Sequence, residues 1–125
     1  MATFTVKLKV WNPVDPSRTA ELEAWADTGA AYSWISGARL EPLNVQKVRR
    51  LQFRTIEGKT IERDLAAVFL SADGYTGGDN VVIAEGADLE VLGAHSLESL
   101  GLAVDPVHKK LVPLVVALGL LAQQK

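Results

Sequence analysis

The segment LEAWADTGAAYSWI, residues 22–35, places one carboxylate, that of Asp27, among apolar and small side chains. Before the acid, apolar residues stand at every second position, at Leu22, Ala24 and Ala26. Because side chains alternate between the two faces of a strand, this pattern predicts a strand with one face in the core. The acid is therefore expected at the end of a half-buried strand.

The two residues after the acid end this alternation. Thr28 carries a hydroxyl, and Gly29 has no β-carbon, so another backbone or a ligand can come close to the chain here. Neighbouring backbone amides can hold a carboxylate in such a turn. From these residues alone two interpretations are open: a functional acid, or an Asp that caps its own backbone in an ordinary turn.

The composition limits the classes of function. The chain has 125 residues, which predicts a single domain over residues 1–125. Its hydrophobic fraction of 48% is high for a small protein, so we expect a second copy to cover part of the apolar surface. With 13 basic and 15 acidic residues the formal charge is -2, which gives no electrostatic reason to bind nucleic acid or an anionic membrane.

Cysteine is absent, which excludes disulfides, thiol catalysis and thiolate metal sites. Its absence also fits a reducing compartment, and a cytoplasmic location is expected. His95 and His108 have no spacing with carboxylates that suggests a metal site, so neither a metal nor a cofactor is expected. Residues 1–12 alternate in polarity, unlike a secretory signal, and the longest apolar run, residues 111–122, is shorter than the roughly 20 residues of a membrane span. The protein is predicted to be soluble.

The strands around the acid follow from alternation and from turn residues. Residues 4–10 and 19–26 predict two strands, joined as a hairpin by a longish loop that turns at residues 12–17. Residues 31–35 predict a strand that leaves the acid on its other side. For residues 38–45 a single helical turn and a loop both remain open, because a proline prevents a long helix.

Residues 47–56 and 59–70 predict a long β-hairpin with its tip at Glu57 and Gly58. Its outer part is polar and has little to bury, so we expect it to protrude and move. The later elements are expected to be a loop over residues 71–80, a short strand over 81–84, a two-turn helix over 94–100, an extended segment over 102–105 and a last strand over 110–121. The whole chain is predicted to be mostly β with one short helix.

The acid loop, residues 27–30 (DTGA), matches the catalytic signature of aspartic proteases. A second segment, residues 91–93 (VLG) followed by the expected helix and by residues 100–106 (LGLAVDP), resembles the apolar-apolar-glycine segment behind the catalytic loop of retroviral-type, retropepsin-like proteases. Within this family, the two segments resemble the form seen in the bacterial single-domain members. The order of the elements also agrees, and the resemblance covers about residues 3–115.

This resemblance implies a small, closed, barrel-like β domain that supplies half of an active site and acts as a homodimer on peptide or protein substrates. Two Asp27 carboxylates would meet at the dimer axis and share one proton, because two like charges so close cannot both ionise. They would activate water for attack on a peptide carbonyl without a metal. Thr28 would hydrogen-bond across the axis, and Gly29 would admit the substrate backbone. The catalytic residues are then Asp27, Thr28 and Gly29.

The same resemblance assigns substrate binding to the loop and to the hairpin tip. The tip would be a flap that closes over an extended peptide. The substrate-binding residues expected on this basis are Ala30, Ile56, Glu57, Gly58 and Lys59.

The sequence departs from the family pattern close to the acid. Trp25, Tyr32 and Trp34 are bulkier than the residues expected there, and they would either narrow a pocket or pack inside the dimer. Ala31 replaces a common threonine or serine. These departures leave an alternative, a dimerisation or peptide-binding module that keeps the fold without hydrolysis. In either case the apolar residues 111–121 are expected near the subunit contact.

Overall fold

Nine strands and three short helical segments make up residues 4–115, the part of the chain that the computed structural model describes. The strands are β1 (Thr5–Asn12), β2 (Asp15–Ala26), β3 (Trp34–Ser36), β4 (Gln46–Arg54), β5 (Thr60–Ala72), β6 (Tyr75–Ala84), β7 (Val91–Leu92), β8 (Leu102–Asp105) and β9 (Lys110–Pro113). The helical segments are α1 (Gly37–Leu40), the 3-10 turn η1 (Glu41–Leu43) and α2 (Ala94–Leu100). The prediction of a mostly β fold is confirmed.

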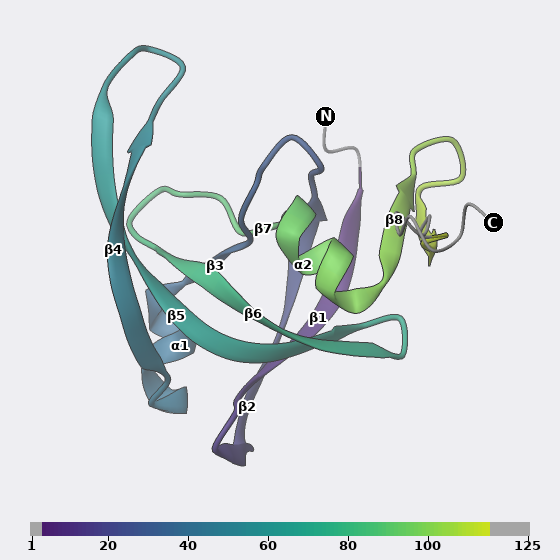
Figure 1. Cartoon of the computed structure of the whole chain (residues 1–125), viewed down its shortest axis with the longest axis horizontal. Coiled ribbons are helices and arrows are strands. Elements are labelled where there is room, and N and C mark those ends of the chain that lie inside the picture. Colours follow the sequence, from purple (N-terminus) through teal and green to yellow (C-terminus); the bar gives the residue numbers. More distant parts are fainter. Residues whose placement is uncertain (1–3, 116–125) are drawn as a thin grey trace, which may run out of the picture.

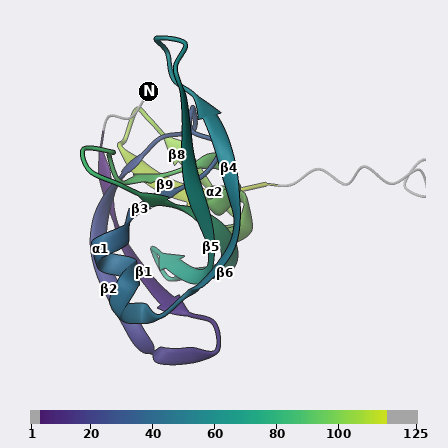
Figure 2. The same ribbon diagram turned by 90° about the vertical axis from the view of Figure 1, so that its left-hand side faces the viewer.

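Seven of these strands form one sheet in the order β1-β2-β7-β3-β6-β5-β4. β1 also pairs with β5 at Lys9, Val10 and Trp11, so the sheet curves round and meets itself along this short stretch (Figure 2). β8 and β9 form a separate two-stranded sheet that follows α2 (Figure 1). Closure is therefore limited to three residues, and β4 remains at the edge of the sheet.

The hydrophobic core is built on the alternation of β1 and β2. Leu8 and Val10 of β1 and Leu22 and Ala24 of β2 are at most 6% exposed, and Leu8 lies directly opposite Leu22. Leu97 of α2 packs in the same cluster. Each buried leucine contributes about 1.5–3 kcal/mol relative to an exposed one. The second half of β2, which leads to the acid, is thus fixed by the core, as its sequence predicts.

The connection between β1 and β2 is shorter than the expected loop over residues 12–17. β2 begins at Asp15, so only Pro13 and Val14 form the turn. The buried side chain of Asn12 explains this, because its Nδ2 donates to the carbonyl of Leu43 at 2.9 Å while its Oδ1 accepts the amide of Val14 at 2.9 Å. Asn12 therefore ends the strand and ties the turn to η1.

The prediction of a loop over residues 71–80 and a short strand over residues 81–84 is wrong. β5 runs to Ala72 and β6 begins at Tyr75, and only Asp73 and Gly74 turn, with φ of 53° and 83°. Two positive φ angles make this a type I′ hairpin turn, which Asp-Gly favours. The two later glycines of this stretch lie inside β6, where they serve close packing: a β-carbon on Gly78 would come within 2.8 Å of the Phe69 ring.

The helix expected at residues 94–100 is confirmed as α2. At residues 38–45, where a helical turn and a loop were both open, the chain forms η1 and most of α1, which begins at Gly37, so the chain has more than one short helix. The strand expected at residues 31–35 is shorter and later, as β3, because the carbonyls of Ala30 and Ala31 accept hydrogen bonds from the first amides of α2. Of the last strand expected at residues 110–121, β9 covers Lys110–Pro113, and residues 116–121 lie outside the described part.

The predicted long hairpin is confirmed as β4 and β5. The two strands pair from Gln46 and Ala67 to Arg54 and Thr60, and a short turn joins them. Their outer end extends beyond the rest of the molecule (Figure 1). The hairpin root, in contrast, is part of the seven-stranded sheet through the pairing of β5 with β6. Within the described residues, the outer end therefore pairs only within the hairpin, while the root is held in the sheet.

Candidate active site

Asp27 stands in the first position after β2, half-buried, in a loop held by backbone hydrogen bonds. Its amide donates to the carbonyl of Leu92 in β7 at 3.0 Å. Its carboxylate Oδ1 accepts the amide of Gly29 at 2.9 Å, and its carbonyl accepts the amide of Ala30 at 3.2 Å. The backbone of the acid is thus fixed to the sheet, and one carboxylate oxygen is oriented by the loop itself.

Gly29 and Thr28 are both exposed. A β-carbon on Gly29 would lie 3.1 Å from Asp27 Oδ1, so a side chain there would press on the carboxylate. Within the described residues, no side chain donates a hydrogen bond to Asp27. One chain therefore presents a single carboxylate whose second oxygen has no protein donor among these residues.

The loop is supported from behind by the junction of β7 and α2. β7 pairs in parallel with the end of β2 and antiparallel with β3, so it lies between the two segments that flank the acid. At Gly93 the backbones are so close that a β-carbon would lie 2.4 Å from the Tyr32 carbonyl oxygen and 2.8 Å from that of Ala30. The amides of Ala94 and His95 then donate to Ala30 and Ala31 at 2.8 and 2.9 Å. A glycine is required here because a side chain would collide with these backbone atoms. The backbone conformation is not the reason, since a φ of -98° suits any residue.

A buried chain of hydrogen bonds joins the same junction to β6. Ser33 Oγ accepts the amide of Gly93 at 2.9 Å and donates to Ser96 Oγ at 2.6 Å. Ser96 Oγ donates in turn to Asp79 Oδ2 at 2.7 Å, and both serines are 0% exposed. Sequence reasoning missed this set. Its one signal is a serine inside an apolar run, at Ser33, whose partner in α2 is 63 residues away.

A cavity of about 350 Å³ lies between the acid loop and the β4–β5 hairpin. Its walls come from the segment that follows the acid and from both strands of the hairpin. It is lined by Gly29, Ala30, Ala31, Tyr32, Trp34, Phe53, Arg54, Thr55 and Ile61. The bulky residues noted in the sequence thus have different positions: Tyr32 and Trp34 line the cavity, while Trp25 lies on β2 with 41% of its surface exposed.

The hairpin tip does not share this cavity. Ile56 is fully exposed at its end, and Gly58 has the left-handed φ of 88° that the turn requires. Inside the tip, the amide of Thr55 donates to the carbonyl of Lys59 at 2.7 Å. Of the expected substrate-binding residues, only Ala30 lines the cavity; Ile56, Glu57, Gly58 and Lys59 project beyond it. The hairpin residues that line the cavity are instead Phe53, Arg54, Thr55 and Ile61, and the sequence reasoning did not select them.

Just beyond the hairpin root, Arg63 of β5 is tied to the loop before β7 by an ion pair. Arg63 Nε and Asp88 Oδ2 are 2.8 Å apart, and both side chains are less than one-fifth exposed. The hydrogen bond from Arg63 outweighs burial and holds the pKa of Asp88 below its ordinary value. Asp88 also accepts the amide of Glu85 at 2.8 Å. This carboxylate is structural, because its oxygens are already engaged.

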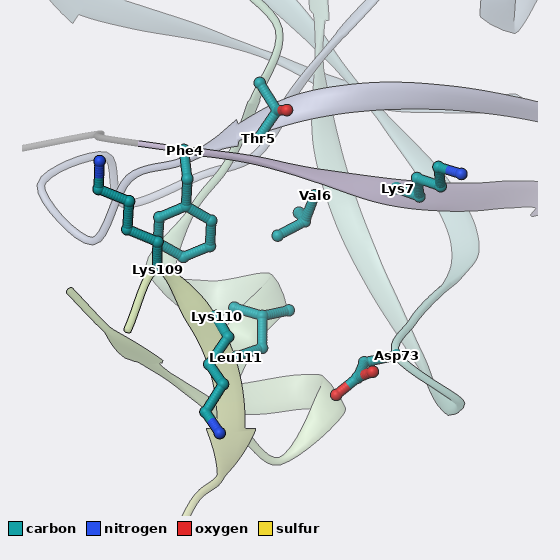
Figure 3. A pocket seen from close by; sticks show the side chains of 8 residues that line it. All are labelled: Phe4, Thr5, Val6, Lys7, Asp73, Lys109, Lys110 and Leu111. Carbon is teal, nitrogen blue, oxygen red and sulfur yellow. The ribbon is translucent and has the colours of Figure 1, made fainter. Parts of the chain in front are cut away.

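A larger cavity, about 500 Å³, lies elsewhere, between β1, β9 and the β5–β6 turn. Phe4, Val6 and Leu111 gather in it, whereas the ammonium group of Lys7 points away (Figure 3). It shares no lining residue with the acid loop, so its size does not make it the active site. Among residues 4–115 there is no group of three or more His, Asp or Glu side chains placed to hold a metal ion. In the same range, none of the helices combines the length and apolar character needed to cross a membrane.

Solved structures of known proteases resemble this arrangement. One is the simian foamy virus (mac) protease in solution, 17% identical with a TM-score of 0.54, aligned over 76% of this chain and 92% of that one. Another is the EIAV protease in complex with the inhibitor HBY-793, 20% identical with a TM-score of 0.58, aligned over 81% of this chain and 89% of that one. No protein-family model and no curated protein matches the sequence. At these identities the likeness establishes the fold, and the resemblance to a bacterial single-domain form stays a prediction. The chain has the fold of the retroviral proteases.

Proposed function

We propose that two copies of this chain form an aspartic endopeptidase in which the two Asp27 carboxylates activate water. The position of Asp27 carries the proposal. In the fold of retroviral proteases, this acid lies at the end of a core strand, in a loop held by hydrogen bonds with Leu92 and Gly29. A cavity under the projecting hairpin lies beside it. A single chain offers one carboxylate. The chemistry needs two, so the second comes from a second copy.

In the proposed dimer the two carboxylates share one proton, because a second charge at such short range is strongly disfavoured. The ionised carboxylate removes a proton from water, and that water attacks the carbonyl carbon of the scissile peptide. The protonated carboxylate donates to the carbonyl oxygen, and the tetrahedral intermediate then collapses as the leaving nitrogen is protonated. No covalent enzyme intermediate forms.

The other loop residues have supporting roles. Thr28 is exposed next to the acid, where its hydroxyl is available to the partner's loop. Gly29 leaves room for the substrate backbone and gives its amide to the carboxylate. The hairpin tip, with Ile56 fully exposed, closes over an extended peptide, which then bonds through its backbone in the manner of an added strand.

Cleavage of a peptide library at mildly acidic pH tests the reaction class. Asp27→Asn keeps the size and the Gly29 contact but removes the shared proton, so we expect cleavage to fall at least 100-fold, the lower end of about 10²–10⁴ for general acid–base catalysis. Asp73→Asn is the matched control, since Asp73 lies in a remote turn at a φ of 53° that asparagine also adopts. Equal cleavage by wild type and Asp27→Asn would refute the proposal.

The assembly is tested separately by sedimentation. The proposal requires a dimer of two single-domain chains, residues 1–125, at concentrations where cleavage is seen. A stable monomer at high concentration would leave the site with one acid and contradict it. A dimer that binds peptides but cleaves none would instead identify the alternative, a peptide-binding module. Whether residues 111–121 lie at the contact remains a prediction, because most of that run lies outside the described residues.

A further inference from the structure

Strand β4 has one edge without a neighbouring strand. It pairs with β5 on one side and is last in the order of the seven-stranded sheet, so among the described residues no strand pairs with its other side. It lies at the outside of the molecule in both views (Figure 1, Figure 2). Alternate backbone N–H and C=O groups of such a strand point away from the sheet and can pair with an extended chain. The register with β5 is irregular between Lys47 and Arg49 and regular from Arg49 to Arg54, so the regular part is residues 49–54.

The charged side chains of this strand all have the same sign. β4 contains four basic residues and no acidic one, and the four, all exposed, are Lys47, Arg49, Arg50 and Arg54. The whole hairpin, residues 46–64, has six basic and three acidic side chains, a formal charge of +3, although the formal charge of the chain is -2. The hairpin is therefore a positive region of a negatively charged protein.

The acidic residues of β5 neutralise only part of this charge. Arg50 Nε lies 3.1 Å from Glu62, its Nη1 lies 3.2 Å from Asp64, and Asp64 also pairs with the lysine of β4 at 3.6 Å. Arg49 and Arg54 form no ion pair within residues 4–115. A guanidinium group binds a carboxylate through two parallel hydrogen bonds. The two ends of residues 49–54 thus each present a guanidinium group that can bind an external carboxylate.

The two faces of β4 differ, and this defines the chemistry of an occupant. On one face Phe53 packs on Trp34, with ring centroids 5.1 Å apart, and Leu51 is half-buried beside them. Arg49 is at the root end of this face, and Arg54 is on the opposite face, because side chains alternate along a strand. In a strand added beside β4, apolar residues would extend the first face and acidic residues would lie next to the arginines. A segment in which apolar and acidic residues alternate fits both.

Repulsion excludes a second copy of the same edge. Two β4 strands side by side would bring four basic side chains against another four. Charges on edge strands prevent self-pairing in this way. An acidic strand meets attraction instead, since opposite charges on neighbouring strands stabilise their pairing. The charge of the edge therefore discriminates between these two occupants.

We propose that the β4 edge, residues 49–54, is a docking site for an extended segment of a partner protein in which acidic and apolar residues alternate. The segment adds to the sheet as a further strand beyond β4. Backbone hydrogen bonds hold it, and Arg49 and Arg54 select its carboxylates. This interaction goes beyond the proposed peptidase and needs no hydrolysis.

Fluorescence anisotropy with a dye-labelled decapeptide of alternating valine and glutamate tests the proposal, in full-length Asp27→Asn so that the peptide stays intact. We expect saturable binding that weakens with added salt. Replacing both Arg49 and Arg54 by glutamine should raise Kd about 3-fold or more. Replacing Lys7 and Lys9 by glutamine is the matched control, since it removes the same charge from exposed positions of β1 and should leave Kd unchanged.

Three results of this assay would overturn the proposal. Equal weakening in both double variants would show general attraction to a basic protein. A Kd above about 1 mM for the peptide would show that the charges only protect the edge. Tighter binding of a single-stranded oligonucleotide than of the peptide would identify a nucleic-acid surface. A peptide with five valines followed by five glutamates should bind more weakly than the alternating one, and equal binding of the two would contradict strand addition.

Hydrogen exchange locates the bound peptide. At a free concentration about ten times Kd, the β4 amides that point away from β5 should exchange about 10-fold more slowly, because only the free protein exchanges there. The amides of Gly29, Ala30 and Ala31 should be unaffected. Protection of these acid-loop amides without protection of β4 would place the peptide in the proposed active site and refute the docking edge alone. Absence of cleavage by wild type, with β4 protected, would refute only the peptidase.

Discussion

Gly93→Ala should destabilise the protein through one contact. A β-carbon at this position would lie 2.4 Å from the carbonyl oxygen of Tyr32 and 2.5 Å from its carbonyl carbon. These are backbone atoms of the segment that follows the acid, so they cannot turn aside as a flexible side chain could. The φ of -98° at Gly93 suits alanine, which means that the backbone conformation adds no cost of its own.

The size of the effect follows from overpacking. Forcing a methyl group into such a contact costs about 1–3 kcal/mol. For a chain of this length a loss of 1 kcal/mol lowers the melting temperature by about 4 °C, so Gly93→Ala should melt about 4–12 °C below wild type. The hydrogen bonds from α2 to the acid loop lie at the same junction, so the proposed peptide cleavage should fall together with the stability.

Thermal unfolding followed by circular dichroism measures this effect, with protein concentration held fixed because association shifts the transition. Gly37→Ala is the matched control. Its β-carbon would meet a methyl group of Ile83 at 3.2 Å, and alanine is a better helix former in α1, so this variant should melt within about 2 °C of wild type or above it. If Gly93→Ala melts like wild type, the junction is not the tight backbone contact described, and the account of how the acid loop is held is wrong.

Two further changes test the supports of the site. Asp88→Asn should lower the free energy of unfolding, measured in urea at pH 7, by about 1–2 kcal/mol, because a hydrogen bond from the charged Arg63 is weakened. Folding lowers the pKa of Asp88, so its carboxylate stabilises the protein fully above the ordinary pKa of 3.8 and loses this effect as the pH falls below that value. The difference in stability between the variant and wild type should therefore shrink by pH 3. A constant difference from pH 7 to pH 3 would contradict this. Ser96→Ala removes a hydrogen-bond partner from the buried Ser33 and from the partly buried Asp79, and it should cost about 1–3 kcal/mol. Ser99→Ala, at an exposed position of the same helix, should stay within about 0.5 kcal/mol. Equal costs for the two serines would show that the buried chain contributes nothing.

The sequence predicts the fold correctly where a local residue pattern is compatible with only one local structure. Strict alternation placed Leu22, Ala24 and Ala26 in the core, as found. α2 ends where expected because Gly101 takes the left-handed φ of 73°. The error at residues 71–80 arose from counting glycines as loop residues. An Asp-Gly pair between two strands is itself the hairpin signal, and the glycines beyond it are packed in a strand.

The site was predictable only where it is local. The DTG segment marks the acid, but the residues that hold it come from distant parts of the chain. Nothing near Ser33 in the sequence indicates Ser96 or Asp79, because their contact depends on how β3, α2 and β6 are arranged. The position of Phe53 against Trp34 likewise depends on the path of the hairpin over the sheet. No periodic pattern in the sequence predicts contacts of this kind.

These contacts between distant segments determine how much of the acid loop still has to be ordered when two chains associate. The backbone of Asp27 is held by Leu92, and the segment after it by Gly93 and the buried serines, all within one chain. In the proposed dimer the loops therefore meet already ordered, and association carries little cost for ordering them. A defect at Gly93 should then lower stability and activity together at every protein concentration. A defect at the subunit contact should instead lower activity only where the dimer dissociates, and adding protein should restore it.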